Sequence, residues 1–205
     1  MGDAARTDRT APGGAALVIL DMINPLDFDG SGPLVEAAEA AAQVILELRQ
    51  AADRLEVPVI YVNDNHGEWH SDRSRIIERC QAPGVPGRKI AQQLEPRPGD
   101  FFVIKPEFSG FYATNLPVLL PKLGVSRIVL TGVASDVCVL FTAAGAHMRA
   151  YELWIPSNAV AGEEQERTRW ALEIMAKAMS ADTRAHPERR LDDFAGEGRP
   201  SEVPT

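Results

Sequence analysis

Residues 127–142 of the chain read Arg127-Ile-Val-Leu-Thr-Gly-Val-Ala-Ser-Asp-Val-Cys-Val-Leu-Phe-Thr142. The first part is an apolar run rich in β-branched residues, which is typical of a buried strand, and a glycine separates it from a predicted helix. Cys138 therefore lies at the start of a helix that follows a strand. The positive end of such a helix lowers the pKa of a thiol, which makes Cys138 a candidate nucleophile.

Two other ionisable residues occupy comparable places in the sequence. Asp21 follows the apolar run 15–20, and Lys105 follows the apolar run 101–104. Ligands of open parallel α/β sheets bind at the edge where the carboxyl ends of the strands meet. The sequence therefore predicts that an acid, a base and a thiol lie together at one edge of a parallel sheet.

The alternation of strand and helix patterns predicts a three-layer α/β/α sandwich with a parallel sheet of about six strands. The expected strands are 15–21, 59–62, 101–105, 127–131 and 152–155, with a short sixth strand near 179–183. The expected helices are 33–55, 71–80 with Ser71 as N-cap, 89–94, 115–123, 135–149 and one with Glu163 and Glu164 in its first turn, whose buried side is Trp170, Ile174, Met175 and Ala178. We expect a single domain over 15–183, flanked by disordered tails at 1–14 and 184–205.

Composition excludes several classes of function. The chain has 205 residues, 45% of them apolar, which is ample for one core. The net charge of −8 argues against nucleic acid or an anionic membrane as a partner. No apolar run approaches the ~20 residues that span a bilayer, and residues 1–14 lack a signal core, so a cytoplasmic location is expected. The two cysteines form no disulfide framework, and we interpret Cys80 as a small buried hydrophobe.

Three segments carry a family resemblance. Leu-Asp-Met-Ile-Asn-Pro at 20–25, Val-Ile-Lys-Pro-Glu-Phe-Ser-Gly-Phe at 103–111 and Thr-Gly-Val-Ala-Ser-Asp-Val-Cys-Val at 131–139 resemble, in this order, the signature segments of the isochorismatase-like cysteine hydrolases, which include nicotinamidases and N-carbamoylsarcosine amidases. The resemblance runs from about residue 15 to about residue 183 and implies the strand order 3-2-1-4-5-6. It assigns Cys138 as nucleophile, Asp21 as proton acceptor and donor, and Lys105 as the cation that keeps the carboxylate ionised and stabilises the thiolate.

The same resemblance implies an oxyanion hole after the fourth strand. In proteins that look like this one, a cis peptide bond precedes the small residue of that turn, here between Val133 and Ala134. The backbone N–H groups of Ala134 and Cys138 would then hold the oxyanion. Ser135 or Asp136 is the expected N-cap, and a bond from Ser135 to the N–H of Cys138 would make that donor unavailable.

Asp64, His66 and His70 could be read as a metal site, since nicotinamidases bind a divalent metal through an Asp-x-His pair and a later histidine. Asn65 stands where that pattern has tryptophan, no proline follows the pair, and His70 is closer than the expected third ligand. We therefore expect no metal and no cofactor, and interpret these residues as a polar wall of the active site.

Six further residues are candidates for substrate binding. Aromatic residues in segments at the active edge are interpreted as pocket walls, and two asparagines could hydrogen-bond an amide or acid group of a substrate. These candidates are Phe28, Trp69, Phe108 and Phe111 for the walls, and Asn24 and Asn63 for the hydrogen bonds.

The sequence favours a hydrolase that cleaves an amide or related C–N bond of a small molecule through a thioester on Cys138. One alternative is an isochorismatase-type hydrolase of a vinyl ether, without covalent catalysis. Another is a catalytically idle protein that binds a small molecule. The resemblance also implies a homo-oligomer, with the helix at 135–149 and the loop at 82–99 as candidate contact surfaces.

Overall fold

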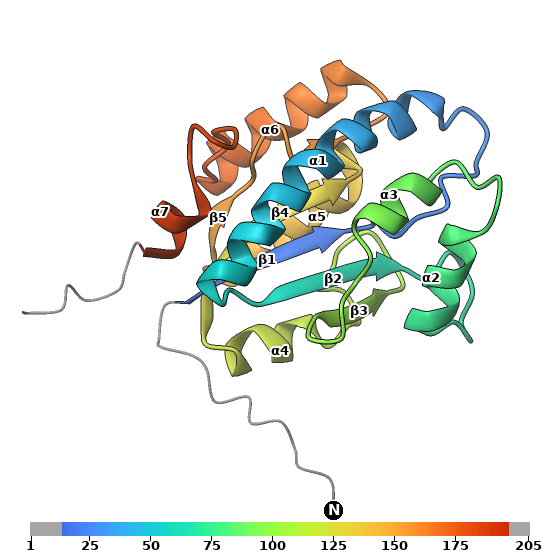
Figure 1. The fold of residues 1–205 in the computed structure, drawn as a ribbon. Helices are drawn as coiled ribbons and strands as arrows, with labels where there is room; N and C mark the ends of the chain where they lie inside the picture. The colour runs from blue at the N-terminus through green and yellow to red at the C-terminus, as the bar shows by residue number, and fades with distance from the viewer. Residues whose placement is uncertain (1–13, 197–205) are drawn as a thin grey trace, which may run out of the picture.

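A computed structural model describes residues 14–196, in which one parallel sheet lies between two layers of helices (Figure 1). The sheet has the order β3-β2-β1-β4-β5, and β6 pairs with β4 beyond the end of β5. This confirms the predicted fold class. The strands are β1 (Gly14–Leu20), β2 (Val59–Asp64), β3 (Phe101–Lys105), β4 (Val125–Val133), β5 (Glu152–Trp154) and β6 (Val160–Ala161).

The sixth strand is formed by other residues than expected. β6 is Val160–Ala161, which continues the sheet beside Gly132 and Val133 of β4. Of the segment 179–183, Asp182 alone takes part in the described sheet, through an isolated bridge to Trp154. A two-residue strand is too short to show alternation in the sequence, which is why β6 was not predicted.

Helices cover both faces of the sheet because its central strand is buried on both sides. Along β1, Leu17 and Ile19 point into one core, and Val18 and Leu20 point into the other. The first core lies under α1, which crosses in front of the sheet in Figure 1, and the second lies under α5 behind it. The first layer contains α1 (Gly32–Leu55), α2 (Arg73–Gln81), α3 (Arg88–Gln93) and α7 (Leu191–Gly196), and the second contains α4 (Leu116–Lys122), α5 (Leu140–His147) and α6 (Gln165–Met179). No helix within residues 14–196 is both long and apolar enough to cross a bilayer.

The N-cap of α2 differs from the prediction. Asp72 caps the helix, and its carboxylate accepts the backbone N–H of Arg75 at 3.0 Å. The hydroxyl of Ser71 instead donates to the carboxylate of Glu68 at 2.8 Å. Both residue types are good caps, so the sequence alone could not choose between neighbours.

The buried side of α6 also differs from the prediction. Ala171 and Met175 are the buried residues of this helix, whereas Trp170 and Ile174 are 49% and 48% exposed. Ala178 is exposed as well. The small side chain of Ala171 lets the helix pack closely on the second core, and this orientation turns the large apolar pair outward.

The segment predicted as a disordered C-terminal tail is ordered up to residue 196. Leu191 and Phe194 of α7 are buried, and the ring of Phe194 lies 5.8 Å from that of Trp154. The guanidinium of Arg127 donates to the backbone carbonyl of Phe194. The burial of Leu191, the contact of Phe194 with Trp154 and the hydrogen bond from Arg127 thus hold α7 in place. The polar composition of the segment gave no sign of these contacts. The predicted tails at 1–13 and 197–205 lie outside the described residues, and Gly14 belongs to β1.

Asp182 anchors this segment. Its carboxylate accepts the backbone N–H of Arg184 at 2.9 Å and bonds the guanidinium groups of Arg184 and Arg189. The side-chain hydrogen bond from Arg184 leads the interactions that hold the pKa of Asp182 well below its usual value, against the opposing effect of burial.

We expect Asp182→Asn to lower the free energy of unfolding by about 1–2 kcal/mol at neutral pH, because the amide keeps the shape and loses the charge. A lowered pKa in the folded state contributes stability above the ordinary value of 3.8, and that contribution is lost as the pH falls toward the lowered value. Urea unfolding at pH 7 and pH 3 should therefore show a difference between variant and wild type that shrinks in acid. Asp193→Asn, on the exposed side of α7, is the matched control, and equal losses from both variants would contradict the anchoring role.

Candidate active site

The structure brings Asp21, Lys105 and Cys138 together at the carboxyl edge of the sheet. Asp21 follows β1 directly in a left-handed backbone conformation with φ of 50°, and Lys105 is the last residue of β3. Cys138 lies in a π-helical turn, Ser135–Val139, between β4 and α5. Asp21 and Lys105 are therefore held at strand ends of one sheet, and Cys138 is held by the turn that follows β4.

The ammonium of Lys105 is the centre of this site. Its Nζ lies 3.0 Å from Oδ2 of Asp21, 3.2 Å from Oδ2 of Asp64 and 3.4 Å from Sγ of Cys138. Lys105 is 0% exposed, and Asp21 is buried beside it. A buried ammonium is tolerated because two carboxylates replace the water that it has lost.

Lys105, Asp21, Asp64 and Cys138 form one charge cluster. The role of Asp64 in it was not predicted, because Asp64 was interpreted as part of a polar wall of the active site and not as a partner of Lys105. Asp64 is the last residue of β2 and the register partner of Lys105 on β3. Its backbone N–H also donates to Oδ1 of Asp21 at 2.7 Å. The signal was present in the sequence: Asp64 follows a buried strand at the same edge as the other ionisable residues.

The pKa of Cys138 moves in the opposite direction to the sequence-based expectation. Burial, followed by the negative charge of Asp21, raises the pKa of the thiol to about 12. Burial also raises the pKa of the Asp21 carboxyl, against the opposing effect of Lys105. Burial lowers the pKa of Lys105, but Asp21, Cys138 and Asp64 together raise it above its ordinary value. The resting site therefore holds an ammonium and a neutral thiol, and the thiol needs a base to become a nucleophile.

The turn that carries Cys138 is capped by the backbone. The N–H groups of Val137 and Val139 both donate to the carbonyl of Ala134, each at 3.1 Å, and no side chain caps the turn. The prediction of Ser135 or Asp136 as N-cap is therefore wrong. The turn opens with a cis peptide bond between Val133 and Ala134.

The side chains of Ser135 and Asp136, the first two residues of the turn, bond to α6 instead of capping the turn. Ser135 shares a hydrogen bond of 2.8 Å with the hydroxyl of Thr168 on α6, and Asp136 pairs with Arg167 at 2.5 Å. The hydroxyl of Ser135 is thus directed to α6 rather than to the N–H of Cys138.

Gly132 allows β4 to approach β1 closely just before the turn. Its φ is +111°, and a Cβ atom built there would lie 2.0 Å from the carbonyl oxygen of Leu20. That carbonyl belongs to the peptide that leads into Asp21. Any larger residue at 132 would have to displace the backbone that positions this carboxylate.

The two asparagines proposed for substrate binding use their side chains within the chain. Oδ1 of Asn24 accepts the N–H of Leu26 at 2.9 Å, and Nδ2 of Asn63 donates to the carbonyl of Ile23 at 2.8 Å. Asn63 is fully buried, and its Oδ1 has no hydrogen-bond partner among residues 14–196. Both residues shape the loop after Asp21, and a role toward substrate stays a prediction.

The four aromatic candidates are divided by the structure. Phe28, Trp69 and Phe108 are exposed, and Phe108 lies 5.8 Å from the ring of Phe141. Phe111 is 5% exposed and belongs to the second core, where it packs against Tyr151. Phe111 thus lies in the second core, and a role for it as a pocket wall stays a prediction.

The described part of the chain does not bring the residues considered for a metal together as a ligand set, and the absence of a metal stays a prediction. Within residues 14–196 no three His, Cys, Asp or Glu side chains are arranged to hold an ion. Asp64 uses one carboxylate oxygen for Lys105 and the other for the N–H of His66 at 2.6 Å, and His70 is exposed. The carboxylate that a metal would need is therefore occupied by a cation of the chain itself.

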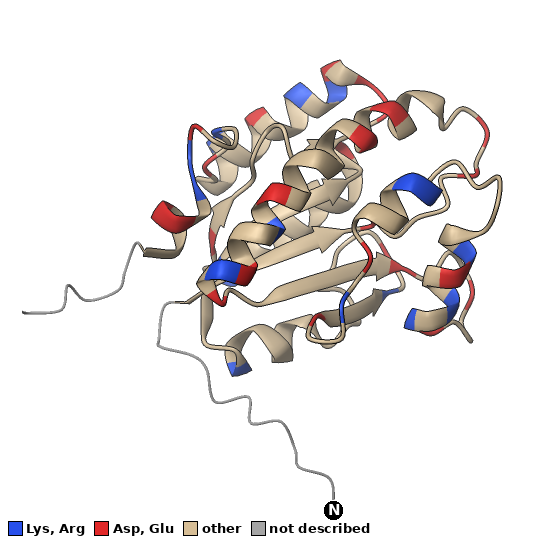
Figure 2. Ribbon diagram, in the orientation of Figure 1, with Lys and Arg blue, Asp and Glu red and all other residues tan. Residues whose placement is uncertain are grey.

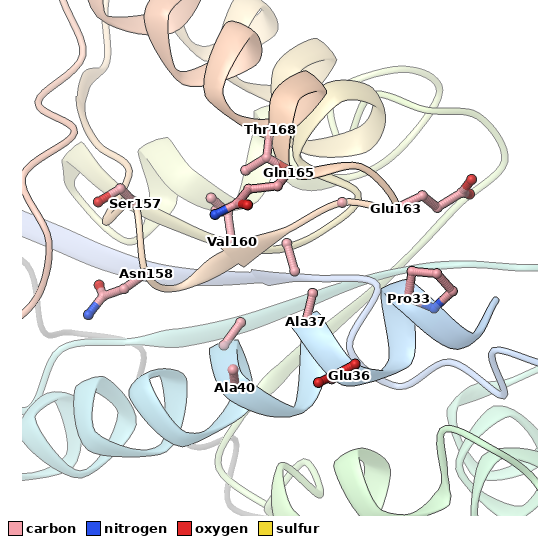
Figure 3. Close-up of a pocket in the computed structure, with 13 residues that line it drawn as sticks. Pro33, Glu36, Ala37, Ala40, Ser157, Asn158, Val160, Glu163, Gln165 and Thr168 are labelled. Atoms are coloured by element: carbon pink, nitrogen blue, oxygen red, sulfur yellow. The ribbon is translucent and has the colours of Figure 1, made fainter.

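A cavity of about 580 Å³ lies between α1 and the segment 157–168 (Figure 3). Ala37 and Ala40 of α1 form one wall, and Val160 and Thr168 lie on the opposite side. Asp21, Lys105 and Cys138 do not line it, so the cavity and the cluster are separate features. Cys80 is a buried residue of α2 that faces the first core, and burial raises the pKa of its thiol to about 12.

Comparison with known proteins places the chain in a family. A family model described as the isochorismatase domain matches residues 15–186. The isochorismatase family protein YaaI of Bacillus subtilis (strain 168) is 38% identical over 167 residues, which cover 82% of this chain and 91% of that protein. The chain belongs to the isochorismatase family, as the three sequence segments predicted.

Two similar proteins have names that state an activity. The ureidoacrylate amidohydrolase RutB of Azorhizobium caulinodans is 29% identical over 150 residues, which cover 60% of this chain and 66% of that protein. The crystal structure of N-carbamoylsarcosine amidase from Thermoplasma acidophilum has a TM-score of 0.65 at 26% identity, over 84% of this chain and 96% of that one. Such relatives support assignment of this chain as a hydrolase.

We expect Lys105→Met to lower the free energy of unfolding by about 3–5 kcal/mol at pH 7, because it leaves Asp21 ionised and buried without a cation. The loss should be smaller in acid, where the carboxyl takes up a proton. Urea unfolding is the measurement, and Lys122→Met, at the exposed end of α4, is the matched control. The double variant Asp21→Asn/Lys105→Met should recover much of the loss, and a Lys105→Met protein as stable as the control would contradict the argument.

Proposed function

We propose that this protein is a cysteine-dependent hydrolase that cleaves an amide or related C–N bond of a small molecule through a thioester intermediate. One observation carries the proposal: Lys105 Nζ lies within 3.0 Å of a carboxylate oxygen of Asp21 and 3.4 Å of the sulfur of Cys138. A base, a cation and a thiol in contact are the groups that covalent acyl transfer needs.

The first half of the reaction forms the thioester. The thiol of Cys138 donates a hydrogen bond to Asp21, and its proton passes to this carboxylate as Sγ attacks the substrate carbonyl. The raised pKa of Asp21 makes it a better acceptor for that proton. The C=O electron pair moves onto oxygen, where the N–H groups of Ala134 and Cys138 are the proposed donors. Asp21 then protonates the leaving nitrogen as the C–N bond breaks.

The second half releases the acid. A water molecule gives a proton to Asp21 and attacks the thioester carbonyl, and the C–S bond breaks as the proton returns to sulfur. Lys105 stays protonated throughout, since its raised pKa keeps it charged beside two carboxylates. Its positive charge stabilises the sulfur whenever the sulfur is negative. The cycle requires no metal or cofactor.

The relatives favour C–N bond cleavage over the vinyl-ether alternative. Ureidoacrylate amidohydrolase and N-carbamoylsarcosine amidase are both named for hydrolysis of a C–N bond next to a carbonyl group. Ureido and carbamoyl compounds, together with simple carboxamides, are therefore the substrates to screen first, with release of ammonia or acid as the readout.

The decisive experiment traps the acyl group. A slowly hydrolysed ester or amide substrate should leave an acyl mass on the peptide that contains Cys138, detected by mass spectrometry after a rapid acid quench. Cys138→Ala should lose both adduct and turnover, and Cys138→Ser should be poor because a hydroxyl has a far higher pKa than a thiol.

Cys80→Ala is the matched control and should keep both the adduct and the turnover, because Cys80 belongs to α2 and lies in the first core, outside the charge cluster. An active Cys138→Ala protein without an adduct would instead support the vinyl-ether alternative. A wild-type protein inactive on every amide, ureido, carbamoyl and vinyl-ether compound would favour the idle binding protein.

The pH dependence of kcat/KM should report Asp21. The carboxylate must be ionised to accept the thiol proton, and burial raises its pKa above the ordinary value of 3.8, so activity should fall in acid at a pH above that value. Asp21→Asn should fold and lose at least about 10²-fold in rate. Asp64→Asn frees Lys105 for Asp21 and should move the acid limb to lower pH. An acid limb at or below pH 3.8 in the wild type would rule out a raised pKa for the base.

A further inference from the structure

We infer that the exposed face of α6 is the interface of a homodimer in which the α6 helices of two copies pack antiparallel about a two-fold axis. This face is defined by six residues: Glu166, Arg169, Trp170, Glu173, Ile174 and Lys177. It lies opposite the buried residues Ala171 and Met175.

The apolar part of this face has no cover within the described chain. Trp170 and Ile174 lie one helical turn apart, and each leaves about half of its surface in solvent, at 49% and 48%. Large apolar residues that are grouped on one helix face mark contact sites more often than scattered ones do. Tryptophan is also enriched among the residues that carry binding energy at interfaces.

The charges on the face are arranged so that a second copy complements the first. Figure 2 shows both acidic and basic positions along α6, the helix at the top of the view. In an antiparallel pair, Glu166 of one copy lies opposite Lys177 of the other, Arg169 opposite Glu173, and Trp170 opposite Ile174. The midpoints of these three pairs are positions 171.5, 171 and 172, so one two-fold axis near position 171.5 serves all three to within half a residue.

The positions around the helix agree with the same axis. At about 100° per residue, Glu166 and Lys177 lie near the middle of the face, Trp170 and Ile174 on one flank, and Arg169 and Glu173 on the other. A two-fold axis perpendicular to both helices brings like flanks together. The apolar flank therefore meets the apolar flank, and the charged flank meets the charged flank with opposite signs.

Such an interface is closed, because each copy uses the same patch and none is left over for a third. Within one copy the same charges form weaker contacts along the helix: Glu166 lies 3.7 Å from Arg169, and Glu173 pairs with Lys177. Pairs of this kind on an exposed helix contribute little, so they leave the charges available for a partner.

The test uses charge reversal and light scattering with the full chain at micromolar concentration. The wild type should have twice the monomer mass of 22.3 kDa. Glu166→Lys places two pairs of like charges across the axis, and Lys177→Glu does the same with the opposite sign. Each variant alone should raise the dissociation constant by at least about 10²-fold and yield monomers.

An equal mixture of the two variants should recover the dimer. Lysines at 166 and 177 of one copy then face glutamates at 177 and 166 of the other, so both pairs become complementary. The double variant Glu166→Lys/Lys177→Glu should dimerise with itself for the same reason. A parallel arrangement, or an interface elsewhere, does not give this rescue.

Glu36→Lys makes the same charge change on exposed α1 and is the matched control, which should remain dimeric. Circular dichroism and thermal unfolding should show that all variants are folded. A wild type that is monomeric, or an oligomer that both reversals leave intact, would overturn the inference. An oligomer that both reversals leave intact would mean that the interface lies elsewhere, and residues 135–149 and 82–99 would be the next candidates. None of these variants alters a residue of the charge cluster, so the result is independent of the proposed hydrolase activity.

Discussion

The buried ammonium of Lys105 is the interaction on which the rest of the site depends. A lone cation at 0% exposure would be far too costly, and two carboxylates from neighbouring strand ends make it tolerable. Asp21 and Asp64 reach it only because β1, β2 and β3 are adjacent and in register. The sheet therefore fixes the electrostatics of the site, and the same cation then stands 3.4 Å from the sulfur. The adjacency of β1, β2 and β3 therefore determines both the packing of Lys105 and the charge next to the sulfur.

Much of this arrangement could be predicted from the sequence, because the ends of buried strands can be recognised where an apolar run stops. Apolar runs that terminate in Asp21 and Lys105, and an apolar run followed by a helix start at Cys138, locate three groups at one edge of a parallel sheet. The direction of the Cys138 pKa shift could not be predicted in this way. A helix start favours the thiolate, whereas burial and a neighbouring carboxylate favour the thiol, and only the packed structure shows that burial is larger.

The wrong predictions share a physical cause, which is that short or amphipathic segments have more than one acceptable orientation. In α6, rotation by a fraction of a turn exchanges Trp170 for Ala171 as the buried residue. In α7, two apolar side chains among charged neighbours are enough to fix a helix once Trp154 provides a surface. Sequence patterns report periodicity, while the choice of face is made by tertiary contacts.

Gly132 has a consequence for how this protein tolerates sequence change. The residue carries no functional group and touches no reacting atom, yet a methyl group there would lie 2.0 Å from the carbonyl that precedes Asp21. In a saturation mutagenesis experiment, position 132 should be as intolerant as the nucleophile itself, for steric rather than chemical reasons. A survey that equates intolerance with catalysis would therefore count one residue too many at this edge of the sheet.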